Sequence, residues 1–415
     1  MRTINLDAVH NISGDTRNKT LLVITPDFPE EKKRYIGSIF VKDQIEPLKK
    51  FFRKIIVICP VLFSFRVLPN DRYCTDYQYD NVNVYYPRCF FLPRGLSIPC
   101  MNNKQKMSFD FRYAAVRRLI EKENIRFDLI HAHFTWPSGA IAVRLKEEFH
   151  VPVIVTIHED SGWLEEEITG NDPRITATWE NADALIRVNR IEVPVLQKFN
   201  TAVFAVPNGF APGYTPLDMQ KCRRALNLPK EQQILFTFGD LLERKGFQYL
   251  IEAMKLLSDQ HKGLLCIIAG KGRFKTNLNN LVEKLNLKDT VIILDQYIPT
   301  EKMPIWINSA NLFIFPSLKE SFGIVQIEAL ACGKPVIAAK NTGSIEVISS
   351  EDVGILCEPG NAASLADAIS RGLEHSWDTA QILAYAQHYR WDIIAEDLIR
   401  VYGTVLKLNP PNQGT

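Results

Sequence analysis

The segment FPSLKESFGIVQIEALACGKPVIA, residues 315–338, decides the fold of this chain because it holds the end of a strand, a helix and the start of a second strand. Its apolar beginning predicts a buried strand, and a helix is expected over 322–332. Gly333 is expected to end that helix, since glycine is common just past a helix C-terminus, and Pro335 opens the next strand. Strand–helix–strand units of this kind build parallel α/β sheets.

The same alternation continues along the chain. Short apolar runs predict parallel strands, because a strand covered on both faces reads as a nearly continuous apolar run. These runs are 21–26, 54–60, 128–134, 152–158, 184–189 and 203–208, then 234–240, 264–270, 291–296, 312–317, 335–340 and 354–359. Helical patterns lie between them at 40–52, 108–124, 246–259, 275–286, 301–308 and 322–332. We therefore predict an α/β protein with two doubly wound, Rossmann-like domains.

The boundary between the domains is expected near residues 207–216, where PNGFAPGYTP holds three Pro and two Gly. We place the N-terminal domain at 1–208, with a polar tail at 1–19, and the C-terminal domain at 209–390. Residues 391–407 form an amphipathic helix with no strand after it. A terminal helix of this kind often packs back on the first domain, although the sequence equally allows it to extend the second. We assign it to the first.

Composition places the chain among ordinary globular proteins. The 415 residues are 46% hydrophobic and 23% charged, which excludes a disordered chain and a small disulfide-rich scaffold. The eight cysteines are scattered and lack zinc-ligand spacing, so we expect a reduced, cytoplasmic protein. We expect neither a signal peptide nor a membrane span, because the longest apolar run, at 55–65, is shorter than the about 20 residues a bilayer requires.

The net charge of +2 conceals an uneven distribution. Residues 1–126 hold 22 basic and 13 acidic residues, a net of +9, whereas the remainder has a net of −7. Basic and aromatic residues are interleaved at 49–54 and 88–98. An ordinary solvated surface explains this pattern as readily as a surface that contacts an anionic membrane or a lipid-phosphate acceptor. No nucleic-acid partner is expected, because no known nucleic-acid module is present.

The strongest functional signal follows the strand that opens the segment at 315–338. Ligands of open α/β sheets bind beyond the carboxyl ends of the strands. Ser321, Phe322 and Gly323 lie there at the expected start of a helix, where unpaired backbone N–H groups favour an anion such as phosphate. Glu320 precedes the helix and Glu328 lies inside its apolar sequence. A carboxylate is costly there without partners, and sugar or ribose hydroxyls would satisfy both acids.

With these residues the chain resembles the family 4 glycosyltransferases, retaining enzymes of the GT-B fold that use nucleotide sugars. The most specific match is the pattern PS-x-x-E-x-FG-x-x-x-x-EA-x-x-x-G-x-PV, which contains Glu320 and Glu328. Further matches are FPEEKKRYIGSIFVKDQ (28–44), DLIHAHF (128–134), VPNG (206–209), GDLLERKG (239–246) and AGKGR (269–273). The resemblance implies two domains facing each other across a cleft, with the acceptor on the first domain and the donor on the second.

The resemblance also implies a role for each matched residue. Glu320 would contact the hydroxyls of the donor sugar, Lys245 the diphosphate, and His158, after the strand at 152–158, would lie near the transferred sugar. These three are the expected catalytic residues. The other expected site residues are Gly239, Arg244, Ser321, Phe322, Gly323 and Glu328 on the donor side and Gly37 and Ser38 on the acceptor side. Neither a metal nor a cofactor beyond the nucleotide sugar is implied.

The chain departs from the family pattern at two places. Asp240 stands where many members have an arginine that binds phosphate, so Lys245 and Arg244 are expected to hold the diphosphate. In the family motif T-x-HG-x-D, Glu159 replaces the usual glycine and Asp160 comes one position early, which leaves their roles open. Two alternatives therefore remain at this point: another GT-B enzyme, either a sugar-nucleotide epimerase or a phosphorylase, and a non-catalytic subunit that binds nucleotide sugars.

Two further histidines lie on the strand at 128–134. His131 and His133 are two residues apart, so their side chains are expected on the same face of the strand. They suggest a metal only if a third ligand exists, and the sequence points to none. No Asp-x-Asp motif occurs, which argues against the metal-dependent glycosyltransferases with a single Rossmann domain.

Overall fold

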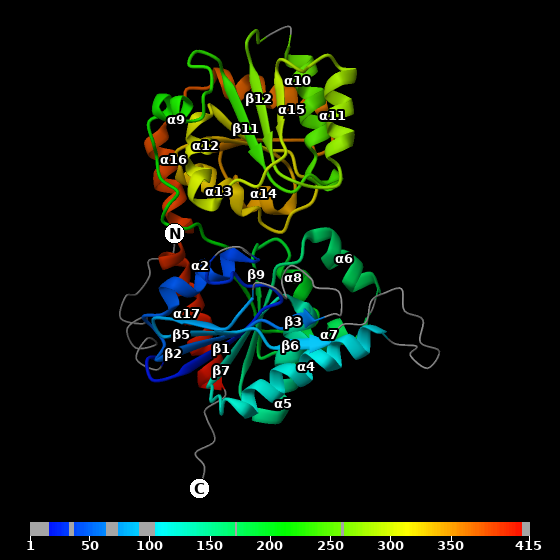
Figure 1. The fold of residues 1–415 in the computed structure, drawn as a ribbon, viewed down its shortest axis with the longest axis vertical. Helices are drawn as coiled ribbons and strands as arrows, with labels where there is room; N and C mark the ends of the chain where they lie inside the picture. Colours follow the sequence, from blue (N-terminus) through cyan, green and yellow to red (C-terminus); the bar gives the residue numbers. More distant parts are fainter. Residues whose placement is uncertain are drawn as a thin grey trace. The chain divides into compact units, whose positions relative to one another are not determined.

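The computed structural model describes residues 16–32, 37–63, 74–90, 104–170, 172–258 and 261–408. It divides into two compact units, each built on its own sheet (Figure 1). The first unit comprises Met1–Glu159, Trp163–Pro207 and Trp391–Thr415, and the second comprises Asp160–Gly162 and Asn208–Arg390.

The first unit contains an eight-stranded sheet with the order β10-β9-β8-β7-β1-β2-β5-β4. Its strands are β1 (Thr20–Ile24), β2 (Lys54–Ile58), β4 (Tyr77–Tyr79), β5 (Val82–Tyr85), β7 (Leu129–His133), β8 (Val153–Ile157), β9 (Ala184–Arg187) and β10 (Val203–Ala205). All pairs are parallel except β4 with β5. The six strands predicted for the first half are thus confirmed, whereas the β4–β5 hairpin was not predicted. A short parallel pair, β3 (Val61–Phe63) and β6 (Arg88–Phe90), lies outside this sheet.

Helices cover both faces of the first sheet. They are α2 (Ile39–Leu48), α4 (Lys104–Lys122), α5 (Ala140–Phe149), α6 (Ser161–Gly170), α7 (Pro173–Asn181), α8 (Val193–Leu196) and α17 (Trp391–Leu408), with a π-helical turn η1 (Thr135–Gly139). The predicted helix at 40–52 stops early, at Leu48, because the chain turns there toward β2. The Asn81 side-chain amide stabilises this turn by donating to the carbonyls of Lys49 and Phe52, at 2.9 and 2.8 Å.

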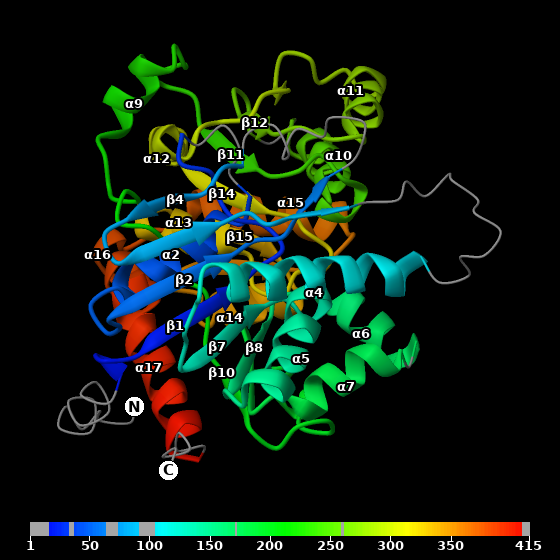
Figure 2. The ribbon, with the colours of Figure 1, turned by 60° about the horizontal axis from the view of Figure 1, so that its bottom comes forward.

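Alternate residues of β1 enter two different cores, as the two-residue period of a strand requires. Leu21 and Val23 pack with residues of α2 and α17, whereas Leu22 and Ile24 pack with residues of α4 and α5. The last helix, α17, therefore completes the core of the first unit after the chain has passed through the second, and it lies beside α2 (Figure 1). Figure 2 shows α4 and α5 on the side of the sheet away from α17.

The second unit contains a six-stranded parallel sheet with the order β13-β12-β11-β14-β15-β16. The strands are β11 (Ile234–Phe238), β12 (Leu265–Ala269), β13 (Val291–Leu294), β14 (Leu312–Phe315), β15 (Val336–Ala339) and β16 (Gly354–Cys357), and all six match predicted runs. The helices are α9 (Met219–Ala225), α10 (Phe247–Leu257), α11 (Lys275–Lys284), α12 (Met303–Ser309), α13 (Ile324–Ala331), α14 (Thr342–Val347), α15 (Ala362–Glu374) and α16 (Thr379–Ala386). No helix in the described part of the chain is long and apolar enough to cross a membrane.

Candidate functional site

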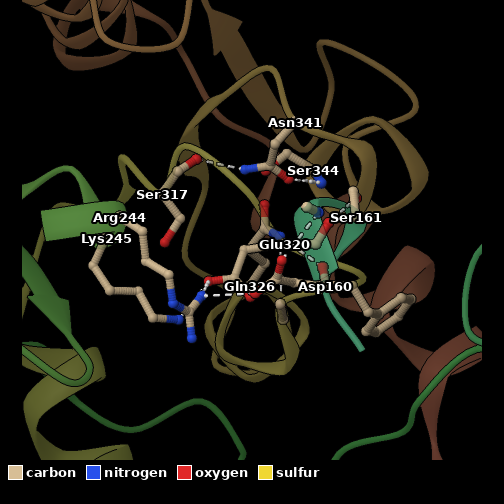
Figure 3. A network of polar contacts seen from close by, with 12 residues as sticks. Asp160, Ser161, Arg244, Lys245, Ser317, Glu320, Gln326, Asn341 and Ser344 are labelled. Atoms are coloured by element: carbon tan, nitrogen blue, oxygen red, sulfur yellow. Dashed lines mark hydrogen bonds and ion pairs between the residues drawn. The ribbon is translucent and has the colours of Figure 1, made fainter. Parts of the chain in front are cut away.

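Three predicted site residues meet at the carboxyl ends of β11 and β14 in the second unit. Lys245, in the short 3-10 turn η2 (Glu243–Lys245), forms an ion pair with Oε1 of Glu320, which follows β14 (Figure 3). The Arg244 guanidinium is 3.8 Å from the same oxygen. The Lys245 and Glu320 side chains are only 18% and 12% exposed, so this pair is shielded from water much more than a surface pair.

Close backbone contact positions these two strand ends. Gly246 has φ +72°, and a Cβ atom there would lie 2.0 Å from the carbonyl oxygen of Pro316. In addition, the Leu318 amide donates to the Arg244 carbonyl at 2.9 Å. Because only glycine permits this approach, the loop that carries Lys245 rests directly on the loop that carries Glu320.

The loops after β11 and β12 are joined in the same way. A Cβ atom on Gly270 would lie 1.9 Å from the carbonyl oxygen of Gly239, the first residue after β11, and the Leu241 amide donates to the Lys271 carbonyl at 2.8 Å. Asp240, which lies between Gly239 and Leu241 in the sequence, is exposed. Gly239 thus acts through its backbone, as a point of contact between two loops.

The start of α13 is fixed against α14. The Glu320 carbonyl accepts hydrogen bonds from the Gly343 amide at 3.0 Å and from Ser161 Oγ at 3.3 Å. A Cβ atom on Gly343 would lie 2.6 Å from the Phe322 backbone nitrogen. These contacts order the loop that leads into the helix. They were not predicted, because the sequence pattern does not show which strand end lies opposite residues 320–323.

Asn341 adds a second connection in this region, and Figure 3 shows its side chain between Ser317 and Ser344. Its side-chain oxygen accepts from the Ser344 amide at 2.8 Å and caps α14, while its side-chain nitrogen donates to the Ser317 carbonyl at 2.6 Å. A single buried amide therefore ties the end of β14 to the start of α14. Sequence reasoning missed Asn341, although Asn is one of the residues favoured at the N-cap of a helix.

The predicted helix at 322–332 begins two residues late, at Ile324, because Gly323 has φ +79° and lies in the left-handed region. The Phe322 side chain is only 1% exposed, so Phe322 can offer a ligand its backbone alone. Glu328 is half-buried on α13. The pKa of Tyr297 is raised mainly by burial and further by the negative charges of Glu301 and Glu328. The structure thus places Ser321 to Gly323 and Glu328 on one short loop and helix.

His158 in the first unit immediately follows β8 and is half-buried, and it lies at the end of a row whose other two members, His131 and His133, are buried. Its Nε2 lies 3.0 Å from Nδ1 of His133, with the two rings stacked. The His131 and His133 ring centroids are 4.4 Å apart, which confirms that both side chains lie on one face of β7. Burial lowers the pKa of His158 and of His131 to about 3 and that of His133 well below its usual value. All three rings are therefore neutral near pH 7.

No metal site is formed by these histidines. Among the residues that the structure describes, no group of three His, Cys, Asp or Glu side chains could hold a metal ion. His131 instead bonds to Thr156 Oγ1 at 2.7 Å and to the Tyr402 hydroxyl at 2.8 Å. Tyr402 was not predicted as part of this cluster, because it comes from the distant helix α17.

Two glutamates that follow β8, Glu159 and Glu167, have raised pKa values. Oε1 of Glu159 accepts from the Thr135 amide at 2.7 Å, and burial raises its pKa. Burial, followed by the nearby Glu159, raises the pKa of Glu167 on α6 to about 8. Oε2 of each carboxyl group is buried without a hydrogen-bond partner in the described part of the structure. Glu167 was missed by sequence reasoning, since it lies on a helix rich in glutamates.

Asp160, whose role the sequence left open, groups with the second unit through its contacts. Its Oδ2 is 3.6 Å from the Arg244 guanidinium, and its Oδ1 accepts from the Gly162 amide at 3.0 Å. Arg244 therefore lies between two carboxylates, those of Asp160 and Glu320 (Figure 3). The two carboxylates therefore partly neutralise Arg244, one of the two cations predicted to bind the donor diphosphate.

The predicted acceptor-side residues lie at the start of α2. Gly37 has φ +50°, and the Val41 amide donates to the Ser38 carbonyl at 3.0 Å, while the Ser38 side chain does not cap the helix. The basic residues at 33–34 and most of the interleaved segment at 88–98 lie outside the described residues. Of the described basic residues, Arg117 pairs with Glu148 at 2.6 Å and with Glu121 at 2.9 Å.

Two family models match the chain. The model "Glycosyl transferases group 1" matches residues 218–388, and the model "Glycosyl transferase 4-like domain" matches residues 60–208. The two matches fall on the second and first units respectively, and together they cover most of the chain.

Curated relatives carry glycosyltransferase names. A D-inositol 3-phosphate glycosyltransferase of Acidothermus cellulolyticus is 26% identical over 328 residues, which are 71% of this chain and 71% of the relative. A putative teichuronic acid biosynthesis glycosyltransferase of Bacillus subtilis is 26% identical over 364 residues, 85% of this chain and 88% of the relative.

Solved structures share the fold. Sucrose-phosphate synthase from Thermosynechococcus elongatus aligns with a TM-score of 0.75 at 24% identity, over 94% of this chain and 100% of that structure. Anabaena HepE in complex with UDP-glucose aligns with a TM-score of 0.70 at 18% identity, over 93% of this chain and 100% of that structure. At this identity the likeness establishes the architecture of two Rossmann-like domains.

Proposed function

This chain belongs to the group 1 glycosyltransferases and has the GT-B fold, and on this premise we propose that it moves a sugar from a nucleoside-diphosphate sugar to a saccharide or lipid-linked acceptor. The transfer retains the anomeric configuration and serves the synthesis of a glycan, polysaccharide or glycolipid. The observation that carries the proposal is the shielded pair of Lys245 and Glu320, with Arg244 beside it, at the strand ends of the second unit.

The donor diphosphate is held by Lys245 and Arg244. Both cations lie near Oε1 of Glu320, which fixes their positions before the donor arrives. As the bond between the sugar and the phosphate breaks, negative charge grows on the departing diphosphate, and fixed cations stabilise that charge without reorganising. Glu320 then accepts hydrogen bonds from hydroxyls of the donor sugar, and Glu328 from those of the ribose.

The acceptor is activated by the leaving group. The acceptor oxygen attacks the anomeric carbon on the face from which the diphosphate departs, and the acceptor proton passes to an oxygen of the leaving phosphate. His158 contacts the transferred sugar as a neutral ring. Its pKa of about 3 makes it a weak base near pH 7, which supports a role in contact and orientation over one in proton abstraction. The proposal includes no metal and no cofactor besides the nucleotide sugar.

A thermal-shift screen across nucleotide sugars tests the donor part, because a bound donor raises the unfolding temperature by mass action. The donor that stabilises the chain is then incubated with saccharide and lipid-linked acceptors, and the configuration of the product is read by NMR. We expect a retained configuration and undiminished turnover in EDTA. An inverted product, or epimerisation or phosphorolysis of the donor in place of transfer, would contradict the proposal.

We also propose that the first unit contacts an anionic membrane from the cytoplasmic side. The net charge of +9 over residues 1–126 supports this, and the described cysteines Cys59, Cys74, Cys89, Cys222, Cys266, Cys332 and Cys357 are free and buried, as suits a reducing compartment. Co-sedimentation with vesicles is the test. We expect binding to anionic vesicles that weakens as salt rises, and equal binding to neutral vesicles would contradict it.

A further inference from the structure

Two hydrogen-bonded pairs of side chains run through the core of the first unit. One pair joins Tyr402 of α17 to His131 of β7 at 2.8 Å. The other joins His133 of β7 to His158 at the end of β8 at 3.0 Å. The pairs touch through the rings of His131 and His133, whose centroids are 4.4 Å apart. Together the two pairs extend from Tyr402 on α17 to His158, the residue that contacts the transferred sugar in the proposed function.

The first pair fixes the proton of His131. The Tyr402 hydroxyl is fully buried and bonds only to His131 among the described residues, so it must donate, since an unused buried donor is costly. The Nδ1 atom of His131 accepts this bond, and its Nε2 therefore carries the proton and donates to Thr156 Oγ1 at 2.7 Å. The ring has one tautomer and one orientation.

The second pair places the same kind of constraint on His158. Both rings are neutral, and a bond between two neutral imidazole nitrogens needs one nitrogen with a proton and one without. Only one proton can therefore lie between Nδ1 of His133 and Nε2 of His158. That proton decides which nitrogen of His158 carries hydrogen, and hence whether the other donates or accepts.

Packing against three neighbouring rings restrains the His158 ring in the orientation of this bond. The ring centroids of Phe40 and Phe134 both lie 4.9 Å from that of His158, and the His133 ring stacks on it at 5.3 Å. His133 is in turn held on its other side by His131. While these contacts hold the ring in place, His158 can change its tautomer only if the hydrogen bond to His133 changes with it.

We propose that His133 is a positioning residue, which holds the His158 ring in one orientation and one tautomer for its contact with the transferred sugar. The proposal rests on the proposed function, in which His158 makes that contact. His133 itself touches no substrate. Its effect is on the rate of transfer, since it orients a group before the reaction begins.

Two substitutions of His133 test the role. His133→Leu removes the hydrogen bond, whereas His133→Asn keeps an amide near the place of Nδ1 and rescues it. We expect kcat to fall about tenfold in the leucine variant, the effect of about one hydrogen bond, with the donor KM within about twofold of wild type. The asparagine variant should recover most of the lost kcat. Equal kcat in all three proteins would overturn the proposal.

Tyr402→Phe is the matched control. It removes a buried hydrogen bond of the neighbouring pair but leaves the bond between His133 and His158 in place. We expect a lower unfolding temperature and an unchanged kcat. If Tyr402→Phe lowers kcat as much as His133→Leu does, the effect of His133 is structural and the proposal is wrong.

NMR of ¹⁵N-labelled histidine gives a readout that is independent of activity. The chain has only eight histidines, and the His158 signal is identified by its loss in His158→Gln. Wild type should show one tautomer of His158, and His133→Leu a mixture of two. One unchanged tautomer in His133→Leu would overturn the proposal. If instead the spectra behave as expected but no donor and acceptor support transfer, the proposed function fails and the tautomer assignment stands.

Discussion

Lys245 and Glu320 form an ion pair between the ends of β11 and β14, two strands that are neighbours in the sheet although the residues are 75 positions apart. Parallel strands end at the same edge of a sheet, so the fold brings together a cation and a carboxylate that the sequence keeps far apart. The pair lets the role of each partner be separated by experiment.

The first prediction concerns the cation. Lys245→Ala should lower kcat about 100-fold or more, because it removes a fixed positive charge from the departing diphosphate. Circular dichroism should show an unchanged fold. Lys288→Ala is the control, since it breaks a comparable ion pair with Glu283 whose side chains are well exposed. Wild-type turnover in Lys245→Ala would rule out this residue as a donor ligand.

The second prediction concerns the carboxylate. Glu320→Gln keeps the size of the side chain but frees Lys245 and Arg244 from their negative partner. Binding of the nucleoside diphosphate, measured by calorimetry, should therefore be unchanged or tighter, while transfer falls about 100-fold through the lost contact with the donor sugar. A parallel loss of diphosphate affinity and transfer would mean that Glu320 acts only by holding Lys245.

The third prediction concerns the glycine between the two loops. Gly246→Ala places a methyl group on the Pro316 carbonyl at a residue with φ +72°, so we expect a loss of at least about 2 kcal/mol in unfolding free energy. Transfer should fall with it, since the loop carries Lys245. Gly213→Ala is the control, because no atom lies within 4 Å of its Cβ position. Equal thermal stability of the two variants would contradict the packing described for Gly246.

The fourth prediction concerns pH and His131. Its pKa is about 3 in the folded chain and near 6.5 when unfolded, so the stability gained by keeping it neutral is present above pH 6.5 and is lost as the pH falls toward 3. His131→Asn removes this titration. The stability difference between wild type and variant should shrink by about 1.4 kcal/mol per pH unit below 6.5, measured by urea unfolding. For Tyr402→Phe, which keeps His131, we expect a nearly constant difference.

The fifth prediction concerns Glu167 and has the opposite sign. Its pKa is raised to about 8 in the folded chain, so its contribution to stability is greatest below pH 4.5 and is lost as the pH rises through 8. Glu167→Gln should match wild type at pH 5 and unfold a few degrees higher at pH 9. Glu166→Gln, on an exposed part of the same helix, should leave the unfolding temperature unchanged at both values. A lower unfolding temperature of Glu167→Gln at pH 9 would contradict the prediction.

The parallel strands could be predicted from the sequence because each is a continuous apolar run, as at 153–157. The β4–β5 hairpin was missed, since its residues Tyr77 to Tyr85 alternate with polar ones at the edge of the sheet and form no such run. The helix was predicted to start too early, at 322, because the sequence does not show that Gly323 adopts φ +79°, at a position where a Cβ atom would lie 2.7 Å from the Phe315 ring.

The candidate site was predicted as a set of residues but not as a geometry. The family pattern identifies Lys245 and Glu320 as site residues. Their ion pair, however, depends on the close approach of the Gly246 backbone to Pro316, which is a contact between distant segments of the chain. The bond from Tyr402 to His131 spans 271 positions, so no local pattern could indicate it. Periodicity and spacing in the sequence do not show which distant residues the tertiary fold brings into contact.

The return of α17 to the first unit has a consequence for synthesis on the ribosome. Leu21 and Val23 leave the exit tunnel early, yet the residues that cover them, such as Ile394 and Leu398, are translated nearly four hundred codons later. Throughout that interval the nascent chain presents an incomplete apolar surface. We therefore expect folding during synthesis to depend on protection of that surface, for example by a molecular chaperone, until α17 emerges.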